Sequence, residues 1–394
     1  MAAPEVLANR YRAALVGGGF IGPVHAEALR RIGVEVVGVL GSTPERARPT
    51  ARRVGTDRVY TDLDDLLGDG SVQAVHIASP NAAHFEQARR VLESGRHLVC
   101  EKPLATTSAE TAALRSMARG RPAQAAAVNY NVRFYPLCHE MRQRVARGDL
   151  GRVLSVSGSY TQDWLLDPRD YNWRVEPDGG TNLRAVADIG THWMDLAQFV
   201  VGRPIRAVMA DLATFHRERY RPVGPSETFA GPAGPGATRP VPVTTEDHGA
   251  VLFRMAGDVR GLFHVSQVTA GRKNRLCLEV AGTEASMAWD SESPDHLWIG
   301  RRGAPNELLS RDPALLDGPA AAISHYPGGH VEGFPDTFKQ LALAVYRWVD
   351  AGAQGPPAFP TFDDGHREVV LCEAIARSAR DGAWAEVPDD PPPT

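Results

Sequence analysis

The sequence predicts an α/β domain built on a parallel sheet, followed by an α+β domain with a large, mostly antiparallel open sheet. Three observations predict this fold. The chain has 394 residues, which is too long for one ordinary core and favours about two domains. Its first part alternates short β-branched runs with helical patterns, as parallel strands with crossover helices do. From about Gln124, longer alternating segments follow with few helices between them, which is typical of antiparallel sheets.

The predicted elements follow in chain order. Strands of the first domain are expected at 13–16, 34–40, 72–78 and 97–100, with helices at 23–32, 44–53 and 83–94. Strands of the second domain are expected at 153–160, 205–215, 249–255, 259–269, 275–280 and 285–289, with helices at 134–147, 187–201, 336–351 and 363–381. The Pro- and Gly-rich segment 221–243 is interpreted as an irregular loop. We therefore predict domains at 1–128 and 129–385 and a disordered tail at 386–394.

Composition excludes several classes of partner. The net charge of -4 leaves no basic face for nucleic acid or for an anionic membrane surface. No signal peptide begins the chain and no run of eighteen uncharged apolar residues occurs, so we expect a cytoplasmic protein. The four cysteines lie far apart in the sequence, which favours reduced thiols over a disulfide framework or a zinc site. No metal site is predicted.

A glycine-rich turn, GGGFIG at residues 17–22, follows the first predicted strand and precedes a helix. In this context Gly17 permits a tight turn, Gly19 lets the backbone approach a pyrophosphate, and Gly22 allows close helix packing. The first turn of the helix supplies amide donors. The pattern predicts a Rossmann dinucleotide-binding domain rather than a merely structural turn.

Lys102 is one of only three lysines in a chain that otherwise carries its positive charge on arginine. Arginine is effectively always protonated, whereas a desolvated lysine can lose or share its proton. Lys102 is therefore a candidate catalytic group. Taken alone, it is also consistent with a lysine at a strand end whose stem covers apolar surface.

Asp188 and His192 stand four residues apart, so both lie on one face near the start of the helix predicted there. Such a pair can act on one substrate. The alternatives are a helix-capping carboxylate for Asp188 and a half-buried structural histidine for His192.

The glycine turn, Glu101-Lys102-Pro103 after a later strand, and the Asp188-x-Gly-x-His192 pattern together resemble the Gfo/Idh/MocA oxidoreductase family. SPNAAH at 79–84 and NVRF at 131–134 also match the family, and the resemblance covers nearly the whole chain. It implies an enzyme that moves hydride between a nicotinamide cofactor and a secondary alcohol or ketone of a sugar, glycoside or cyclitol. Lys102, Asp188 and His192 would be the catalytic set, with His192 as base and Lys102 beside the developing oxyanion.

The resemblance also implies a cofactor site. Ser79, Asn81, His84 and Glu101 would hold the ribose and nicotinamide, and Trp173 with Arg174 would close over them. No acid stands at the end of the second predicted strand, where NAD-preferring folds carry one. Ser42 and Arg46 could instead bind a 2′-phosphate, which favours NADP over NAD; loosely held NAD and a tightly retained cofactor stay open. The predicted cofactor contacts are Gly17, Gly19, Phe20, Ile21, Gly22, Ser42, Arg46, Ser79, Asn81, His84, Glu101, Lys102, Trp173 and Arg174.

Substrate contacts are predicted from polar and aromatic residues near the same motifs. They are Lys102, Arg133, Tyr160, Trp164, Asp188, His192 and His330. For each aromatic residue a place at the edge of the core is an equal alternative. Two other functions stay open, an NAD-dependent glycosidase that oxidises its substrate transiently and a non-catalytic dinucleotide sensor. The open sheet favours self-association, and the family resemblance suggests a homodimer or homotetramer.

Overall fold

The chain forms two compact units in this computed structural model, which describes residues 7, 10–176, 182–223 and 238–388. Unit 1 comprises Met1–Phe134 and Gly333–Val369, and unit 2 comprises Tyr135–Glu332 and Val370–Thr394. A late segment, Gly333–Val369, therefore packs with the N-terminal part of the chain. The boundary at residues 128–129 stays a prediction of domain organisation.

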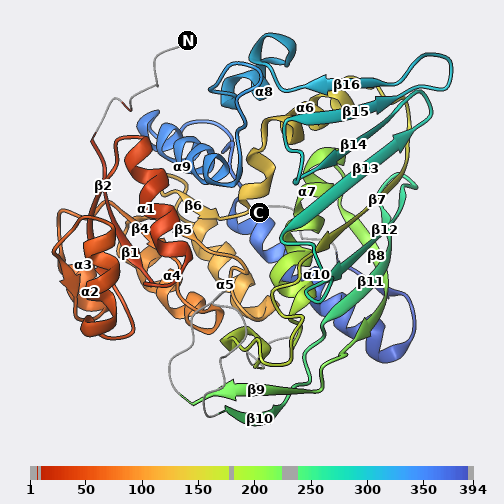
Figure 1. Cartoon of the computed structure of the whole chain (residues 1–394). Helices are drawn as coiled ribbons and strands as arrows, with labels where there is room; N and C mark the ends of the chain where they lie inside the picture. Colours follow the sequence, from red (N-terminus) through yellow and green to blue (C-terminus); the bar gives the residue numbers. More distant parts are fainter. Residues whose placement is uncertain (1–6, 8–9, 177–181, 224–237, 389–394) are drawn as a thin grey trace. The chain divides into compact units, whose positions relative to one another are not determined.

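Unit 1 is built on a parallel sheet with the strand order β3-β2-β1-β4-β5-β6 (Figure 1). The strands are β1 (Arg12–Val16), β2 (Glu35–Leu40), β3 (Val59–Tyr60), β4 (Ala74–Ile77), β5 (His97–Cys100) and β6 (Ala126–Val128). The helices are α1 (Ile21–Arg31), α2 (Pro44–Arg53), α3 (Leu63–Gly68), α4 (His84–Glu93), α5 (Ser108–Arg119) and α9 (Phe334–Asp350), with short 3₁₀ turns η1 (Asn81–Ala83) and η2 (Asn131–Phe134). The strand order reverses between β1 and β4, and ligands of such sheets bind at that switch point.

Both faces of this sheet are buried, as expected for parallel strands. On one face Val75 and Leu98 pack with α4 and α5 residues, and on the other Leu15 and Val39 pack with α1, α2 and α9. Tyr346 of α9 belongs to this second cluster. The late helix α9 therefore completes the core of the N-terminal sheet.

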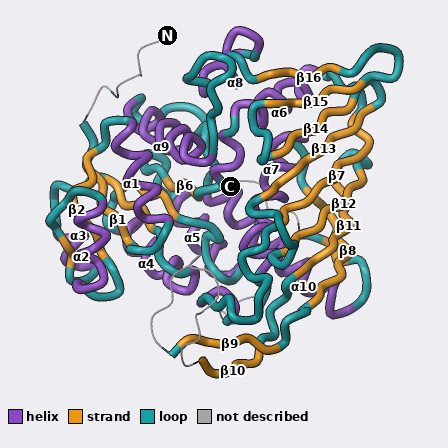
Figure 2. The backbone as a smooth tube through the Cα atoms, in the orientation of Figure 1, coloured by secondary structure: helices purple, strands orange, loops and turns teal. Residues whose placement is uncertain are grey.

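Unit 2 is built on a nine-stranded sheet with the order β16-β15-β14-β13-β7-β12-β11-β8-β17. The strands are β7 (Val153–Thr161), β8 (Ile205–Ala213), β11 (His248–Met255), β12 (Arg260–Ser266), β13 (Arg275–Gly282), β14 (Ser286–Asp290), β15 (His296–Gly300), β16 (Glu307–Ser310) and β17 (Ala385–Glu386). Every pairing in this sheet is antiparallel except that of β7 with β12. Figure 2 shows these strands side by side. The predicted fold class is confirmed.

One face of this sheet is covered by helices of its own unit. Trp193 stacks on Phe263 with ring centroids 4.6 Å apart and meets Phe253 edge-on. The helical elements of unit 2 are α6 (Pro136–Arg147), η3 (Trp173–Val175), a π-helix (Val186–Gly190), α7 (Thr191–Val201), η5 (Pro313–Leu315) and α8 (Gly318–Ile323). The helix α10 (Phe362–Asp381) begins in unit 1 and continues into unit 2 from Val370. The opposite face carries exposed Leu252 and Leu262, which are direct cross-strand partners.

The structure differs from the sequence-based expectations in three places. The predicted loop 221–243 contributes to a hairpin-like pair, β9 (Glu218–Pro222) with β10 (Thr238–Pro242), and its centre lies outside the described residues. The predicted tail begins at 386, yet Glu386 pairs with β8 and Val387 is buried. The helix predicted at 187–201 starts as a π-helix. In the part of the chain that the structure describes, no helix is long and apolar enough to cross a membrane.

Candidate functional site

The glycine turn has the geometry that the sequence predicts. Gly17 has φ +110°, and a Cβ there would lie 2.3 Å from the Ala78 carbonyl oxygen. A Cβ on Gly22 would lie 2.5 Å from the Gly17 carbonyl oxygen. Both positions therefore require glycine for the turn itself.

Gly19 differs from these two glycines, because a Cβ there would have no protein atom within 4 Å. The helix α1 begins next to it, and within the described residues no side chain caps its N-terminus at Phe20. The first turn of α1 also has no acidic residue. Open space beside uncapped backbone amides suits a pyrophosphate. These residues thus fit a dinucleotide.

In a Rossmann fold, residues at the end of the second strand, here β2, bind the adenosine ribose of the cofactor. The Thr43 hydroxyl accepts a hydrogen bond from the Arg46 backbone nitrogen at 3.3 Å and so caps α2. Ser42 and the Arg46 side chain are exposed. A Cβ on Gly41 would lie 2.9 Å from the Ala47 Cβ, so this position has no room for a side chain.

Glu101 follows β5 and is 8% exposed. Its carboxylate accepts hydrogen bonds from His25 Nε2 at 3.0 Å, from the Asn129 amide and from the Lys102 backbone nitrogen at 3.2 Å. Burial alone would raise the pKa of Glu101, but the hydrogen bond from His25 and the nearby positive charges hold it below its ordinary value. Glu101 is therefore a buried, ionised acid.

A chain of buried rings continues from His25. Its Nδ1 lies 3.0 Å from His76 Nδ1, and His76 Nε2 lies 3.2 Å from the Tyr346 hydroxyl. Burial, and then the neighbouring His25, lower the pKa of His76 well below its ordinary value. No sequence pattern predicts this row of rings, because His25, His76 and Tyr346 lie on α1, β4 and α9.

His84 is fully buried and lies between two turns. Its Nδ1 faces the Pro103 carbonyl and its Nε2 faces the Ser79 carbonyl, each at 2.8 Å. The Ser79 hydroxyl donates to Gln87 at 2.6 Å. His84 thus connects the turn after β4 to the Lys102–Pro103 turn after β5, and the side chain itself has no exposed surface. Asn81 is half-buried in η1, beside Ser79.

Asp188 lies in the π-helix of unit 2. Its carboxylate accepts hydrogen bonds from Gln267 Nε2 at 2.8 Å and from Arg174 Nε at 3.3 Å. Arg174 in turn lies over the Trp173 ring, 4.5 Å from its centroid. The structure therefore brings two predicted site residues, Arg174 and Asp188, into direct contact. Gln267 was not predicted, and no motif marks it.

His192 stands at the start of α7 and is 9% exposed. Its ring centroid lies 6.3 Å from that of Tyr160. The Tyr160 hydroxyl donates to Asn274 at 2.8 Å, and burial raises the pKa of Tyr160, with a further contribution from the negative charge of Asp188. Asp188, His192 and Tyr160 thus share one region of unit 2.

The remaining predicted substrate contacts lie in three separate places. Trp164 donates through Nε1 to Gln162 at 2.7 Å. Arg133 donates to Asp364 at 2.7 Å in unit 1. His330 is exposed on a loop whose carbonyls accept from the buried Arg311.

The predicted catalytic set divides between the units, with Lys102 in unit 1 and Asp188 and His192 in unit 2. Lys102 is half-buried and follows Glu101 directly. Its peptide bond to Pro103 is cis. No group of three or more His, Cys, Asp or Glu side chains resembles a metal site among the described residues.

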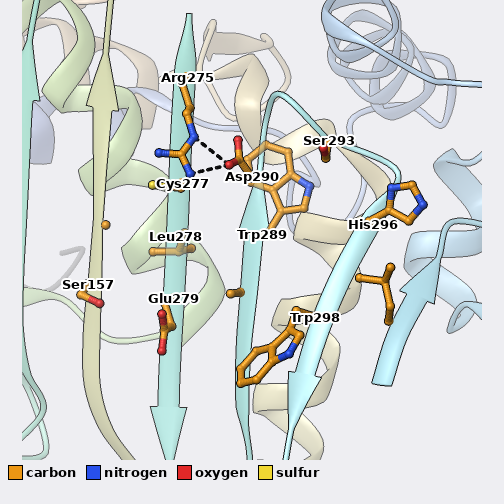
Figure 3. Close-up of a pocket in the computed structure, with 13 residues that line it drawn as sticks. Ser157, Arg275, Cys277, Leu278, Glu279, Trp289, Asp290, Ser293, His296 and Trp298 are labelled. Carbon is orange, nitrogen blue, oxygen red and sulfur yellow. Dashed lines mark hydrogen bonds and ion pairs between the residues drawn. The ribbon is translucent and has the colours of Figure 1, made fainter. Parts of the chain in front are cut away.

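A cavity of about 380 Å³ lies on the nine-stranded sheet (Figure 3), on the outer face, which is the face that carries Leu252 and Leu262. It is lined by residues of β7 and β13 to β16, including Trp298 and the ion pair of Arg275 with Asp290 at 2.6 Å. None of the predicted site residues lines it.

Comparison with known proteins gives matches over both parts of the chain. Residues 11–130 match the family model described as an oxidoreductase family with an NAD-binding Rossmann fold, and residues 138–288 match the GFO/IDH/MocA C-terminal domain. Levoglucosan dehydrogenase of Pseudarthrobacter phenanthrenivorans is 30% identical over 95% of this chain and 97% of its own. Inositol 2-dehydrogenase of Acidothermus cellulolyticus is 27% identical over 97% of this chain and 96% of its own.

Solved structures give the same result. Levoglucosan dehydrogenase in complex with NADH and L-sorbose has a TM-score of 0.86 and 28% identity, covering 97% of this chain and 100% of that one. An inositol dehydrogenase homologue from Azotobacter vinelandii, in complex with NADH and myo-inositol, has a TM-score of 0.83 and 27% identity, covering 96% and 98%.

Proposed function

The chain belongs to the Gfo/Idh/MocA family and is a nicotinamide-dependent oxidoreductase acting on CH–OH groups, and from this membership we propose its substrate class and catalytic residues. The substrate is a cyclic sugar, glycoside or cyclitol that is oxidised at a secondary carbinol. The observation that carries this proposal is the likeness, over nearly the full length of the chain, to relatives whose names specify levoglucosan and inositol.

Lys102, Asp188 and His192 are proposed as the catalytic set. The bound nicotinamide supplies the hydride acceptor or donor. His192 removes the proton from the reacting hydroxyl, and Lys102 stabilises the charge that develops on that oxygen. Asp188, already held by Arg174 and Gln267, accepts a hydrogen bond from a substrate hydroxyl and so orients the ring. Arg133, Tyr160, Trp164 and His330 remain proposed substrate contacts.

For the cofactor, the backbone around Gly17, Gly19 and Gly22 is proposed to hold the pyrophosphate, with Phe20 and Ile21 at the helix start. Asn81 and Glu101 are proposed to hold the ribose and nicotinamide, together with Ser79, Trp173 and Arg174. His84 acts through the two turns that it connects, because its side chain is fully buried.

Ser42 and Arg46 are proposed to bind a 2′-phosphate, so that NADP is preferred to NAD. The exposure of both side chains at the end of β2 supports this proposal. The solved neighbours contain NADH, so kinetics with the two cofactors are the decisive comparison.

One experiment tests the activity. The purified protein is denatured, any released cofactor is identified by mass spectrometry, and inositols, anhydrosugars, free sugars and glycosides are then screened for reduction of NAD and NADP. We expect reduced cofactor and a keto product with at least one cyclic polyol. Release of an aglycone without net cofactor reduction would establish the glycosidase instead, and dinucleotide binding without any turnover would establish the sensor.

Self-association is proposed to occur through the outer face of the nine-stranded sheet. Leu252 and Leu262 are about half exposed there, and Leu308 and Trp298 extend the apolar surface. Exposed apolar patches on sheets commonly mark interfaces. A homodimer or homotetramer is expected by light scattering, and Leu252→Glu with Leu262→Glu should shift it towards monomer. A monomeric wild-type protein would refute this proposal.

A further inference from the structure

The π-helix that carries Asp188 is held at its start by a buried acid. Glu246 is 4% exposed, and its carboxylate accepts from the backbone nitrogens of Arg184 and Val186 at 2.8 Å each. Burial raises the pKa of Glu246 to about 7, although both backbone hydrogen bonds favour the ionised form. π-helical turns are uncommon and are often found at functional sites. The backbone that presents Asp188 is therefore fixed from inside the unit.

Next to this acid lies a buried ionic cluster. Arg184 is 2% exposed, and its guanidinium donates to the Asp247 carboxylate. Asp247 also accepts from Arg219 at 2.9 Å and from the His216 backbone nitrogen at 2.8 Å. Burial alone would raise the pKa of Asp247, but Arg184 and these hydrogen bonds hold it below its ordinary value. The arginine is thus fixed by a charged partner that stays ionised.

Gln267 connects this cluster to Asp188. Its Oε1 accepts from Arg184 Nη1 at 3.3 Å, while its Nε2 donates to Asp188 Oδ2 at 2.8 Å. Because an arginine can only donate and an ionised carboxylate can only accept, both ends of the amide have a defined orientation. Gln267 has no exposed surface. Asp188 therefore receives a hydrogen bond in a fixed direction from a side chain that cannot turn over.

We propose that Gln267, held by Arg184 and Asp247, is a positioning residue that orients the Asp188 carboxylate towards the substrate. This proposal rests on the proposed role of Asp188. With one carboxylate oxygen bound by Gln267 and the other by Arg174, rotation of the Asp188 side chain is restricted from two sides. Fixing a substrate-binding group before the substrate arrives reduces the entropy lost in the reactive complex.

A purely structural role for Gln267 predicts a different result from the same substitution. Gln267→Glu keeps the size of the side chain and keeps an acceptor for Arg184. It replaces the donor that faces Asp188 with a carboxylate oxygen, which repels a second carboxylate. If the orientation of the Asp188 carboxylate did not matter for turnover, this variant would keep the kcat/KM of the wild type even where its stability fell.

The first measurement is steady-state kinetics on the intact enzyme. Gln267→Glu is expected to lower kcat/KM for the polyol about tenfold to a hundredfold, while the dissociation constant of the cofactor changes less than about twofold. Gln198→Glu is the matched control, because Gln198 on α7 accepts from the Ile205 backbone nitrogen at 3.0 Å and the variant retains that acceptor. A kcat/KM for Gln267→Glu within about twofold of the control would overturn the proposal.

The second measurement does not depend on turnover. Protein labelled with ¹³C at the aspartate carboxyl carbons is titrated by NMR, and the Asp188 signal is assigned by its loss in Asp188→Asn. The charged and titratable groups beside Asp188 in its unit include Arg174 from η3 and Tyr160 from β7, with His192 one turn along the chain. Gln267→Glu should raise the midpoint of the Asp188 signal by about one pH unit, because the new carboxylate faces it.

The two measurements distinguish a failure of the positioning role of Gln267 from a failure of the proposed function. An unchanged Asp188 midpoint in Gln267→Glu overturns the positioning role even in an active enzyme. A wild-type protein that oxidises no polyol refutes the proposed function, but the shifted midpoint would still establish that the residue 267 side chain contacts the Asp188 carboxylate.

Discussion

Glu101 in unit 1 and Asp188 in unit 2 are both carboxylates in predicted binding positions, but the groups that support them differ in charge. Glu101 is backed by a row of buried rings, His25, His76 and Tyr346, in which burial lowers the pKa of His76 well below its ordinary value. Asp188 is backed by an ionic cluster that reaches it through the neutral amide of Gln267. One support is a hydrogen-bond chain whose direction can reverse, and the other has its direction fixed by charge.

The hydrogen-bond chain behind Glu101 has one arrangement in which every group is satisfied with neutral imidazoles. His25 then donates from Nε2 to Glu101 and accepts at Nδ1 from His76 Nδ1–H. His76 Nε2 in turn accepts from the Tyr346 hydroxyl. Either ring nitrogen of a neutral histidine can carry the proton, whereas the guanidinium of Arg184 only donates.

The largest expected effect comes from removing one proposed catalytic group in each unit. Lys102→Ala and His192→Asn are each expected to lower kcat by about a hundredfold or more, because each removes a proton-handling or charge-stabilising group. Cofactor affinity, measured by fluorescence quenching, should change little. Lys273→Ala is the control, since that side chain is 83% exposed. A near-normal rate in Lys102→Ala would show that Lys102 is not a catalytic group, and Asp188 and His192 of unit 2 would remain.

A second test contrasts two glycines of the same turn. Gly22→Ala should lower both thermal stability and cofactor affinity, because its Cβ would lie 2.5 Å from the Gly17 carbonyl oxygen. Gly19→Ala should leave the melting temperature unchanged but weaken cofactor binding about tenfold or more, because the open space beside it is proposed to hold the pyrophosphate. Gly68→Ala, at the open end of α3, is the benign control. An unchanged cofactor affinity in Gly19→Ala would show that the pyrophosphate does not bind beside Gly19.

The sequence predicts one unit better than the other for a physical reason. The turn at Gly17 and the position of Glu101 depend on local features, a strand end followed by a glycine or a proline, and these can be recognised without a structure. Gln267 and Glu246 act on Asp188 from positions far along the chain, through sheet and loop geometry that no spacing records. In the sequence His25 and His76 look like ordinary helix and strand residues, and only the fold places His25 beside His76 and His76 beside Tyr346 of α9. Sequence patterns do not reveal hydrogen-bond partners that lie far apart along the chain.

A third test concerns the adenosine end of the cofactor. The clash at Gly41 excludes an acid there, so Ser42→Asp is the suitable substitution. Its carboxylate should repel a 2′-phosphate and change the ratio of kcat/KM values about tenfold in favour of NAD. Ser42→Asn keeps a similar size without the charge and is the control. An unchanged ratio in Ser42→Asp would show that Ser42 does not contact the cofactor.

The smallest expected effect tests whether the chain behind Glu101 is neutral. The folded-state pKa of His76 is lowered, so below pH 6.5 the unfolded chain binds a proton that the folded protein does not, and stability is lost as pH falls. A histidine that is neutral in the folded protein and protonates only in the unfolded chain lowers the free energy of unfolding by about 1 kcal/mol between pH 7.5 and 5.5. His76→Leu should therefore show a smaller loss of unfolding free energy over that range than the wild type, although it is less stable throughout because His25 and Tyr346 lose a partner. Exposed His296→Leu is the control for the loss of an imidazole. If His76→Leu has the wild-type pH dependence, His76 is charged in the folded protein, and the contrast between a neutral and an ionic support fails.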